Sequence, residues 1–189
     1  MDKKIWQNIP EGDHVAYEQL YFDYFKKFYN YGKKFTNDVP LIEDSIQEVF
    51  LEIWSKRERI LEIDSPNSYF FSAFRFILLG KIKQSKKDTW ADLTGDEIDF
   101  SIEQKIIAQE TNSTLQQKIA TALQTLTPRQ KEAIFLRFYE GLCYEEVASV
   151  LHISIKATYK IMARSLASLK DQIDTFLVIL FVLISLFIY

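Results

Sequence analysis

Residues 142–169 contain the side chains best suited to bind another molecule. They read LCYEEVASVLHISIKATYKIMARSLASL, which predicts two helices joined by a tight turn. The first helix is expected around residues 144–151. His152 and Ile153 form the turn, where a positive φ is expected that histidine tolerates better than most residues, and Ser154 caps the second helix. This order of residues indicates a helix-turn-helix.

The second helix of this pair divides into a side expected to be buried and a side expected to be exposed. The buried side, with intervals of four, three and four residues, comprises Thr158, Met162, Ser165 and Leu169. The residues expected to contact DNA are Ser154, Lys156, Ala157, Tyr159, Lys160, Ala163 and Arg164. Lysine and arginine bind phosphates and base edges, and a helix that follows a tight turn fits the major groove. A lone basic helix would more often be a solvated surface, but the complete turn pattern favours DNA binding.

An acidic group forms a second candidate binding surface. Asp44, Gln47 and Glu48 share one helical face because they are separated by three and four positions. On the opposite side the apolar residues expected to be buried are Ile46, Val49, Phe50 and Ile53. The polar strip could then meet a basic partner helix, although an acidic helical face is by itself more often solvated.

An aromatic-rich segment followed by lysines forms a third group, residues 69–87. Ser65 is expected to cap this helix and Pro66 to occupy its first turn. Between Asp64 and Asp88 there is no acidic residue, and the positive charges are Arg75, Lys81, Lys83, Lys86 and Lys87. Aromatic rings stack on bases and lysines attract phosphates, so this pairing favours single-stranded DNA, although its apolar positions would also suit an ordinary core.

The sequence lacks the residue sets that common catalytic motifs require. It has no glycine-rich phosphate loop, no paired histidine–carboxylate motif and no activated-serine motif. Cys143 is the one cysteine and His14 and His152 are the only histidines, so a disulfide within the chain is excluded and a metal site is disfavoured. We expect a protein that is not an enzyme and that has no cofactor and no metal.

Composition predicts an all-helical protein. The chain has 189 residues, of which 48% are hydrophobic and 26% charged, and these values exclude disordered, fibrous and multi-pass membrane proteins. Only 5 glycines and 4 prolines are available for the turns that a β-sandwich or barrel needs. The net charge is 23 − 26 = −3, so positive charge that binds DNA must be concentrated in patches.

Four segments differ in composition. They are a helical domain at residues 10–87, a flexible acidic linker at 88–114, a second helical domain at 115–172 and a hydrophobic tail at 173–189. Six acidic residues precede the first base after Lys87, which favours the linker. In the second domain Thr127 is expected to cap a helix that ends at Gly141 with a positive φ.

Together these motifs resemble the extracytoplasmic-function (ECF) group of the sigma-70 family of bacterial RNA polymerase subunits, over about residues 17–172. Residues 41–54, LIEDSIQEVFLEIW, resemble the acidic helix that docks on the β′ coiled coil of polymerase. Residues from Ser68 onward resemble the helix that melts the promoter and reads its minus-ten element. Residues 126–132 and the helix-turn-helix resemble the domain that reads the minus-thirty-five element. The sequence of residues 157–160, ATYK, most resembles the corresponding segment of family members from Bacteroidetes.

The resemblance implies a function and a set of partners. It implies a sigma factor that directs RNA polymerase to specific promoters and aids promoter opening in transcription initiation. The implied partners are core RNA polymerase (its β′ clamp helices and β flap), promoter DNA and an anti-sigma factor. The alternative is a free-standing helix-turn-helix regulator, which would explain residues 142–169 but not the acidic motif or the charge reversal after Lys87.

Three residues depart from the family pattern. Phe76 stands where the family commonly has asparagine, and Gly80 where it commonly has aspartate, so polar contacts to the opened strand are not carried over to these positions. Tyr159 stands where lysine or arginine is frequent, which indicates an aromatic or hydroxyl contact in the groove.

The last 14 residues, 176–189, read FLVILFVLISLFIY and carry no charge. As a helix they would measure roughly 21 Å at about 1.5 Å per residue. A bilayer core is about 30 Å thick and usually takes about 20 apolar residues. Three alternatives remain: a membrane anchor, a helix packed on its own domains and a helix buried by a partner. No apolar secretory signal follows the N-terminus, so we expect the body of the protein to be cytoplasmic. Of the three alternatives for the tail, association with the membrane is the first.

Overall fold

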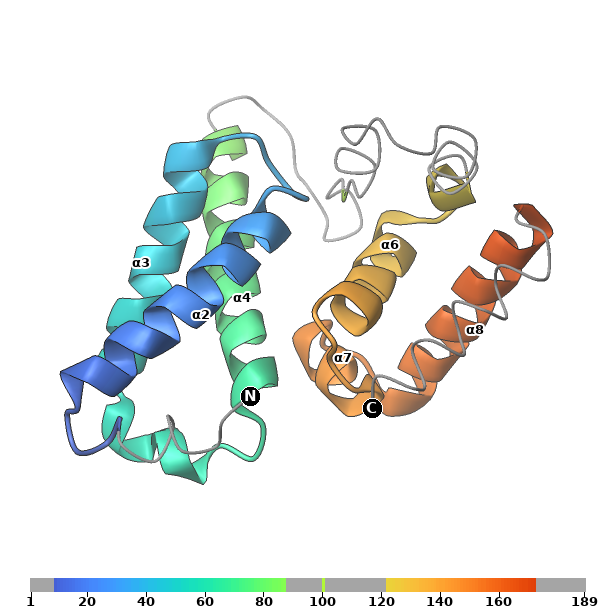
Figure 1. Ribbon diagram of the computed structural model, residues 1–189. Helices are drawn as coiled ribbons and strands as arrows, with labels where there is room; N and C mark the ends of the chain where they lie inside the picture. The colour runs from blue at the N-terminus through green and yellow to red at the C-terminus, as the bar shows by residue number, and fades with distance from the viewer. Residues whose placement is uncertain (1–8, 88–99, 101–121, 173–189) are drawn as a thin grey trace, which may run out of the picture. The chain divides into compact units, whose positions relative to one another are not determined.

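The computed structural model describes residues 9–87, 100 and 122–172, and every regular element among them is helical (Figure 1). The predicted all-α class is confirmed. Most of the predicted acidic linker and the whole hydrophobic tail lie outside the described residues. The chain divides into two compact units between Thr94 and Gly95, and each unit is described by itself. Within the described residues, no helix is both long enough and apolar enough to cross a membrane.

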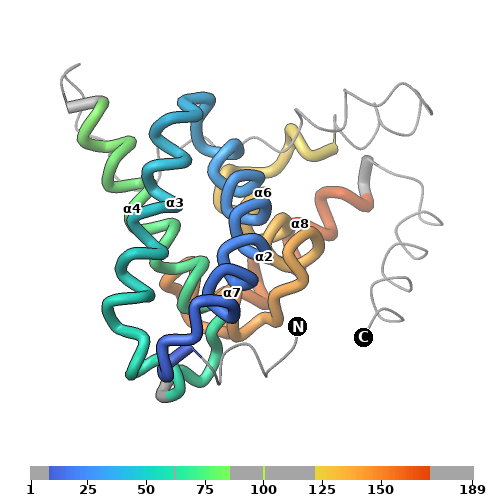
Figure 2. The backbone as a smooth tube through the Cα atoms, turned by 60° about the vertical axis from the view of Figure 1, so that its left-hand side comes forward, coloured from blue at the N-terminus to red at the C-terminus, as the bar shows by residue number. Residues whose placement is uncertain are grey.

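The first unit is built on three helices, α2 (His14–Gly32), α3 (Val39–Ser55) and α4 (Pro66–Lys87), with the short 3-10 helix η1 (Arg57–Glu62) between the last two. Figures 1 and 2 show the three long helices side by side. Their shared core is aromatic. The rings of Phe28 and Phe74 stack with centroids 4.7 Å apart, and Tyr24 meets Phe70 edge-on at 5.0 Å. Such pairs add to the stability that burial of their area provides.

Short polar side chains begin these helices. Asp13 accepts hydrogen bonds from the amides of Val15 and Ala16, and Asp38 accepts one from Leu41 at 3.1 Å. The Ser68 amide donates to the Ser65 hydroxyl oxygen at 3.4 Å, directly before the helix that starts at Pro66. The predicted start of this helix is therefore confirmed, and each cap satisfies amides that lack a partner within the helix.

Gly32 lets the helices of the first unit approach closely. A Cβ atom at this position would lie 2.9 Å from Ile42 Cγ2 and 3.2 Å from Phe74 Cζ. Ile42 and Phe74 are fully buried, so neither can easily move aside. Glycine is required here by packing between α2, α3 and α4.

The second unit contains α6 (Pro128–Ile134), the π-helical turn η3 (Phe135–Tyr139), α7 (Tyr144–Val150) and α8 (Ile155–Gln172). Thr127 caps α6 as predicted: its side chain accepts from the Gln130 amide at 3.3 Å, while the Gln130 side chain accepts from the Thr127 amide at 2.9 Å. The helix does not continue to Gly141 in α-helical geometry. It widens at Phe135, and the Glu140 amide donates to the Phe135 carbonyl, five residues back.

Candidate nucleic-acid interface

The turn between α7 and α8 has the geometry that the sequence predicts. His152 adopts a φ of 50°, and the amide of Ile153 donates to the Ala148 carbonyl at 3.0 Å. The Ser154 hydroxyl accepts from the Ala157 amide at 3.2 Å and so caps α8. The predicted positive φ of Gly141 is also present, at 74°. These residues form a helix-turn-helix in which α8 is the second helix.

The two predicted sides of α8 are also found. Thr158, Met162 and Ser165 are buried, whereas Leu169, also expected on this side, is half-buried. The Thr158 and Ser165 hydroxyls donate to the carbonyls of Ser154 and Ile161. Burial therefore leaves no polar group of these two side chains unpaired. Of the residues expected to contact DNA, Ala157 is half-buried and the exposed ones are Ser154, Lys156, Tyr159, Lys160, Ala163 and Arg164.

An aromatic stack that the sequence analysis did not identify joins α7 to α8. The rings of Tyr144 and Tyr159 are stacked, with centroids 4.5 Å apart and planes 15° apart. The Arg137 guanidinium lies 5.3 Å from the centroid of Tyr144 and donates to the Leu142 carbonyl at 3.1 Å. The two tyrosines are fifteen positions apart in sequence, and only the turn geometry brings their rings together. One face of the Tyr159 ring therefore packs on Tyr144, while 51% of the residue's surface is exposed.

The acidic strip of α3 is exposed, and its opposite face is buried as predicted. Asp44, Gln47 and Glu48 face solvent, whereas the buried residues of the opposite face are Ile46, Val49, Phe50 and Ile53. Leu51, which the sequence analysis did not single out, is 70% exposed and lies one turn beyond Gln47 and Glu48. The strip therefore combines negative charge with one exposed apolar side chain.

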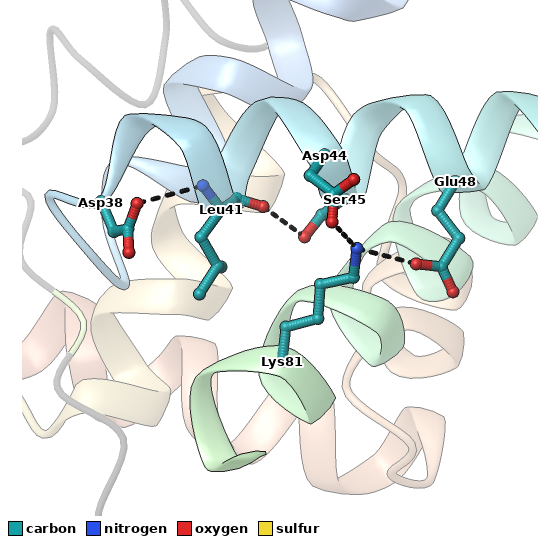
Figure 3. Close-up of polar contacts among 6 residues, drawn as sticks. All are labelled: Asp38, Leu41, Asp44, Ser45, Glu48 and Lys81. Carbon is teal, nitrogen blue, oxygen red and sulfur yellow. Dashed lines mark hydrogen bonds and ion pairs between the residues drawn. The ribbon is translucent and has the colours of Figure 1, made fainter. Parts of the chain in front are cut away.

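Lys81 lies against this acidic strip (Figure 3). Its ammonium group bridges the carboxylates of Asp44 and Glu48, with the Glu48 contact at 2.8 Å. Burial acts to lower the pKa of Lys81, but its hydrogen bonds and charge interactions with the two carboxylates outweigh this and raise the pKa. From its charge and position in sequence, Lys81 is expected among the DNA-binding lysines. The structure instead brings it together with two of the three residues expected to bind polymerase.

Four further basic residues lie on α4. Arg75 is half-buried, Lys83 is exposed, and Lys86 and Lys87 lie in the last turn of the helix. Phe76, one of the departures from the family pattern, is 77% exposed. Gly80 follows one turn later, and no atom lies within 4 Å of the position that its Cβ would take. Phe76 and Gly80 therefore leave an aromatic ring beside an open stretch of helix.

Side chains that could bind a metal are dispersed in the described part of the chain. Among the residues that the structure describes, no three histidine, cysteine, aspartate or glutamate side chains come together as a metal site would require. The candidate surfaces offer charged, hydrogen-bonding and aromatic side chains.

Comparison with known proteins finds similarity to RNA polymerase sigma factors. Residues 116–169, which include the whole helix-turn-helix, match the family described as Sigma-70, region 4. The RNA polymerase sigma-H factor of Pseudomonas aeruginosa is 24% identical over 170 residues, covering 82% of this chain and 84% of the relative. The ECF RNA polymerase sigma factor SigK of Mycobacterium bovis is 23% identical over 178 residues, covering 90% and 92%. None of these tests the expected Bacteroidetes source, which stays a prediction.

Two solved structures share the fold. CnrH, solved in complex with the cytosolic domain of CnrY, aligns over 92% of this chain and 97% of its own with a TM-score of 0.58 at 17% identity. The sigma factor RpoE of Bartonella quintana, solved with the anti-sigma factor NepR, aligns over 82% and 94% with a TM-score of 0.56 at 18% identity. Residues 116–169 therefore belong to the family described as Sigma-70, region 4, and over most of its length the chain is similar to ECF RNA polymerase sigma factors.

Proposed function

We propose that this chain directs core RNA polymerase to specific promoters and aids their opening, and that separate surfaces divide this work. The observation that carries the proposal is their coexistence in one chain: a helix-turn-helix with a basic exposed face and a separate helix with an acidic exposed face. A DNA-binding module alone has no need of the second surface. No step of this function requires bond chemistry by the chain itself.

The acidic strip is proposed to bind polymerase. Asp44, Gln47 and Glu48 offer carboxylate and amide groups to a basic partner helix, and Leu51 adds an exposed apolar contact beside them. Complementary charge speeds encounter and fixes register, while the apolar residue contributes buried area. Replacing Glu48 by lysine should weaken binding to core polymerase at least tenfold and leave binding of isolated DNA unchanged.

The exposed face of α8 is proposed to bind the upstream promoter element. Removing Lys160 or Arg164 should weaken promoter binding by the complete polymerase. A contact to phosphate would lower the dependence of affinity on salt by about one ion, whereas a contact to a base would relax sequence choice at one position. Unchanged promoter binding after both substitutions would refute the assigned face.

The basic and aromatic face of α4 is proposed to hold the opened strand. Arg75, Lys83, Lys86 and Lys87 supply positive charge for this contact, and Phe76 supplies an exposed ring on which a base could stack. Lys81 can join them only when it leaves the carboxylates of α3. Phe76→Ala should slow promoter opening, measured by permanganate reactivity of unpaired thymines, more than it weakens closed-complex binding.

We also propose an anti-sigma factor as a partner and the cytoplasm as the place of action. The first rests on the relatives of similar fold, which were solved with the cytosolic domain of CnrY and with NepR. The second rests on the location of RNA polymerase itself. Membrane association through residues 176–189 belongs to this proposal and is tested by truncation, as described in the Discussion.

Binding of core polymerase without DNA separates this function from its alternative. A sigma factor should bind purified core polymerase when no DNA is present, and the Glu48→Lys variant should bind it at least tenfold more weakly. A free-standing helix-turn-helix regulator should bind its own duplex and show no affinity for core polymerase.

A further inference from the structure

The exposed face of α8 carries two parallel rows of side chains. One row is basic and consists of Lys156, Lys160 and Arg164, each four residues from the next. The other row lies one position earlier and consists of Ile155, Tyr159 and Ala163. All three members of this apolar row are exposed, Ile155 by 46% and Tyr159 by 51%. Residues four apart on a helix are neighbours, so each row is continuous along the face.

We propose that the apolar row reads the 5-methyl groups of thymines in the upstream promoter element, and that Tyr144 is the positioning residue that holds Tyr159 for this purpose. The proposal rests on the proposed function. Lysine and arginine have only donors, which suit phosphates and guanine, whereas apolar side chains in the major groove contact the thymine methyl. The two rows would therefore read different features of the same groove.

The stack beneath Tyr159 makes it suitable for this role. An exposed aromatic side chain would normally sample several rotamers and would lose that freedom on binding. Here one face of the Tyr159 ring rests on Tyr144, and Tyr144 is itself covered by the Arg137 guanidinium. The ring is therefore oriented before DNA arrives, and the remaining exposed surface is what a base can meet.

The occupant of this row follows from what surrounds it. If the apolar row bound a protein, it would not require a parallel row of three basic side chains with the same four-residue spacing. Positive charge along the whole length of the row matches a phosphate backbone that runs beside the contacted bases. Double-stranded DNA is therefore favoured over a protein as the partner of this row. The experiment that follows would also reveal a protein partner.

The test measures discrimination between thymine and uracil, which differ only in the methyl group. Promoters are first selected from a random library with polymerase carrying the full chain, and each upstream thymine is then replaced singly by deoxyuridine. At one or two positions the affinity of the wild-type complex should fall about fourfold, the effect expected for one buried methyl-sized group. Tyr159→Ala and Tyr144→Ala should bring this ratio close to one.

Matched variants separate reading from folding. Tyr159→Phe and Tyr144→Phe keep the rings and should keep the fourfold ratio. Lys160→Ala should weaken binding to the thymine and uracil duplexes equally. Tyr144→Ala should have no further effect on the ratio when Tyr159 is already alanine, because it acts through that ring. Thermal unfolding of each full-length variant identifies any general loss of structure, which would affect both duplexes alike.

Three outcomes would overturn the inference. In the first, replacing thymine by uracil changes the affinity at no upstream position. In the second, the fourfold ratio between thymine and uracil duplexes persists in Tyr159→Ala or Tyr144→Ala. The variants could also change binding to core polymerase or another protein while leaving the ratio intact, which would make the row a protein-docking surface. Failure to select any promoter would instead contradict the proposed function, so the two failures are distinguishable.

Discussion

The Lys81 ammonium nitrogen lies 2.8 Å from Glu48 Oε2 and also contacts the Asp44 carboxylate, so two helices of the first unit are joined by one shared cation. The lysine side chain is 24% exposed, and the carboxylates are 67% and 53% exposed for Asp44 and Glu48. Both acids are proposed to bind polymerase. In the free chain they already have a positive partner, with which the basic residues of polymerase must compete.

Replacing Lys81 by methionine should therefore tighten binding to core polymerase. We expect a gain of roughly two- to fivefold at low salt, because an exposed ion pair is worth up to about 1 kcal/mol. Titration of fluorescently labelled chain with core polymerase measures the change. Lys83→Met is the matched control, since Lys83 is exposed on the same helix, and it should leave affinity unchanged. Weaker binding by Lys81→Met would mean that the lysine orients the carboxylates for their partner.

Two glycines of the first unit should respond to alanine in opposite directions. Gly32→Ala should destabilise the chain by about 1–3 kcal/mol, because the new methyl meets buried Ile42 and Phe74. Gly80→Ala should stabilise it by up to about 1 kcal/mol, because its Cβ would meet nothing and alanine favours the helix. Urea unfolding of the two full-length variants measures both changes. Equal effects of the same sign would contradict the packing described here.

Stability at high pH should depend on Tyr17. Its hydroxyl donates to the Phe50 carbonyl at 2.6 Å, and burial, followed by the neighbouring Tyr21, raises the pKa of Tyr17 from 10.0 to about 12. The unfolded chain thus loses this proton first, and the stability that Tyr17 provides falls as pH rises from 10 to 12. Tyr17→Phe should cost about 1 kcal/mol at pH 8 through the lost hydrogen bond. The difference between the two proteins should shrink across that window, and a constant difference would argue against the raised pKa.

Deletion of the hydrophobic tail should change where the chain is found. Cells that express the full chain should hold part of it in the membrane fraction, and cells that express residues 1–172 should not. Core polymerase binding should be the same for both, because the acidic strip lies far from the tail in sequence. If both forms stay in the soluble fraction as monomers, the membrane-anchor interpretation is wrong, and the tail packs against its own domains instead.

The sequence predicted those features that depend on local spacing. Helix starts at Thr127, Ser154 and Ser65 follow from the hydrogen-bonding side chain at each cap, and the positive φ of His152 follows from the tight turn. The buried and exposed sides of α3 and α8 follow from helical periodicity. These features required no knowledge of how the helices pack.

Features that depend on packing between helices were missed. Lys81 is 37 and 33 positions from Asp44 and Glu48, so no spacing rule could pair it with them. The Tyr144–Tyr159 stack likewise requires the geometry of the turn. The π-helical turn at Phe135 was also missed, because its residues continue an ordinary helical pattern. Charge composition alone grouped Lys81 with the DNA-binding lysines, and it could not show that Lys81 contacts two carboxylates of α3.

Run-off transcription tests the central claim most directly. Core polymerase is incubated with a library of promoter fragments, with the full chain or with its Glu48→Lys variant, and the transcripts are sequenced. We expect transcripts from a small set of related promoters that appear only with the wild-type chain. Transcription that is unchanged by the chain, or equal with the variant, would contradict the claim that this protein directs polymerase through its acidic strip.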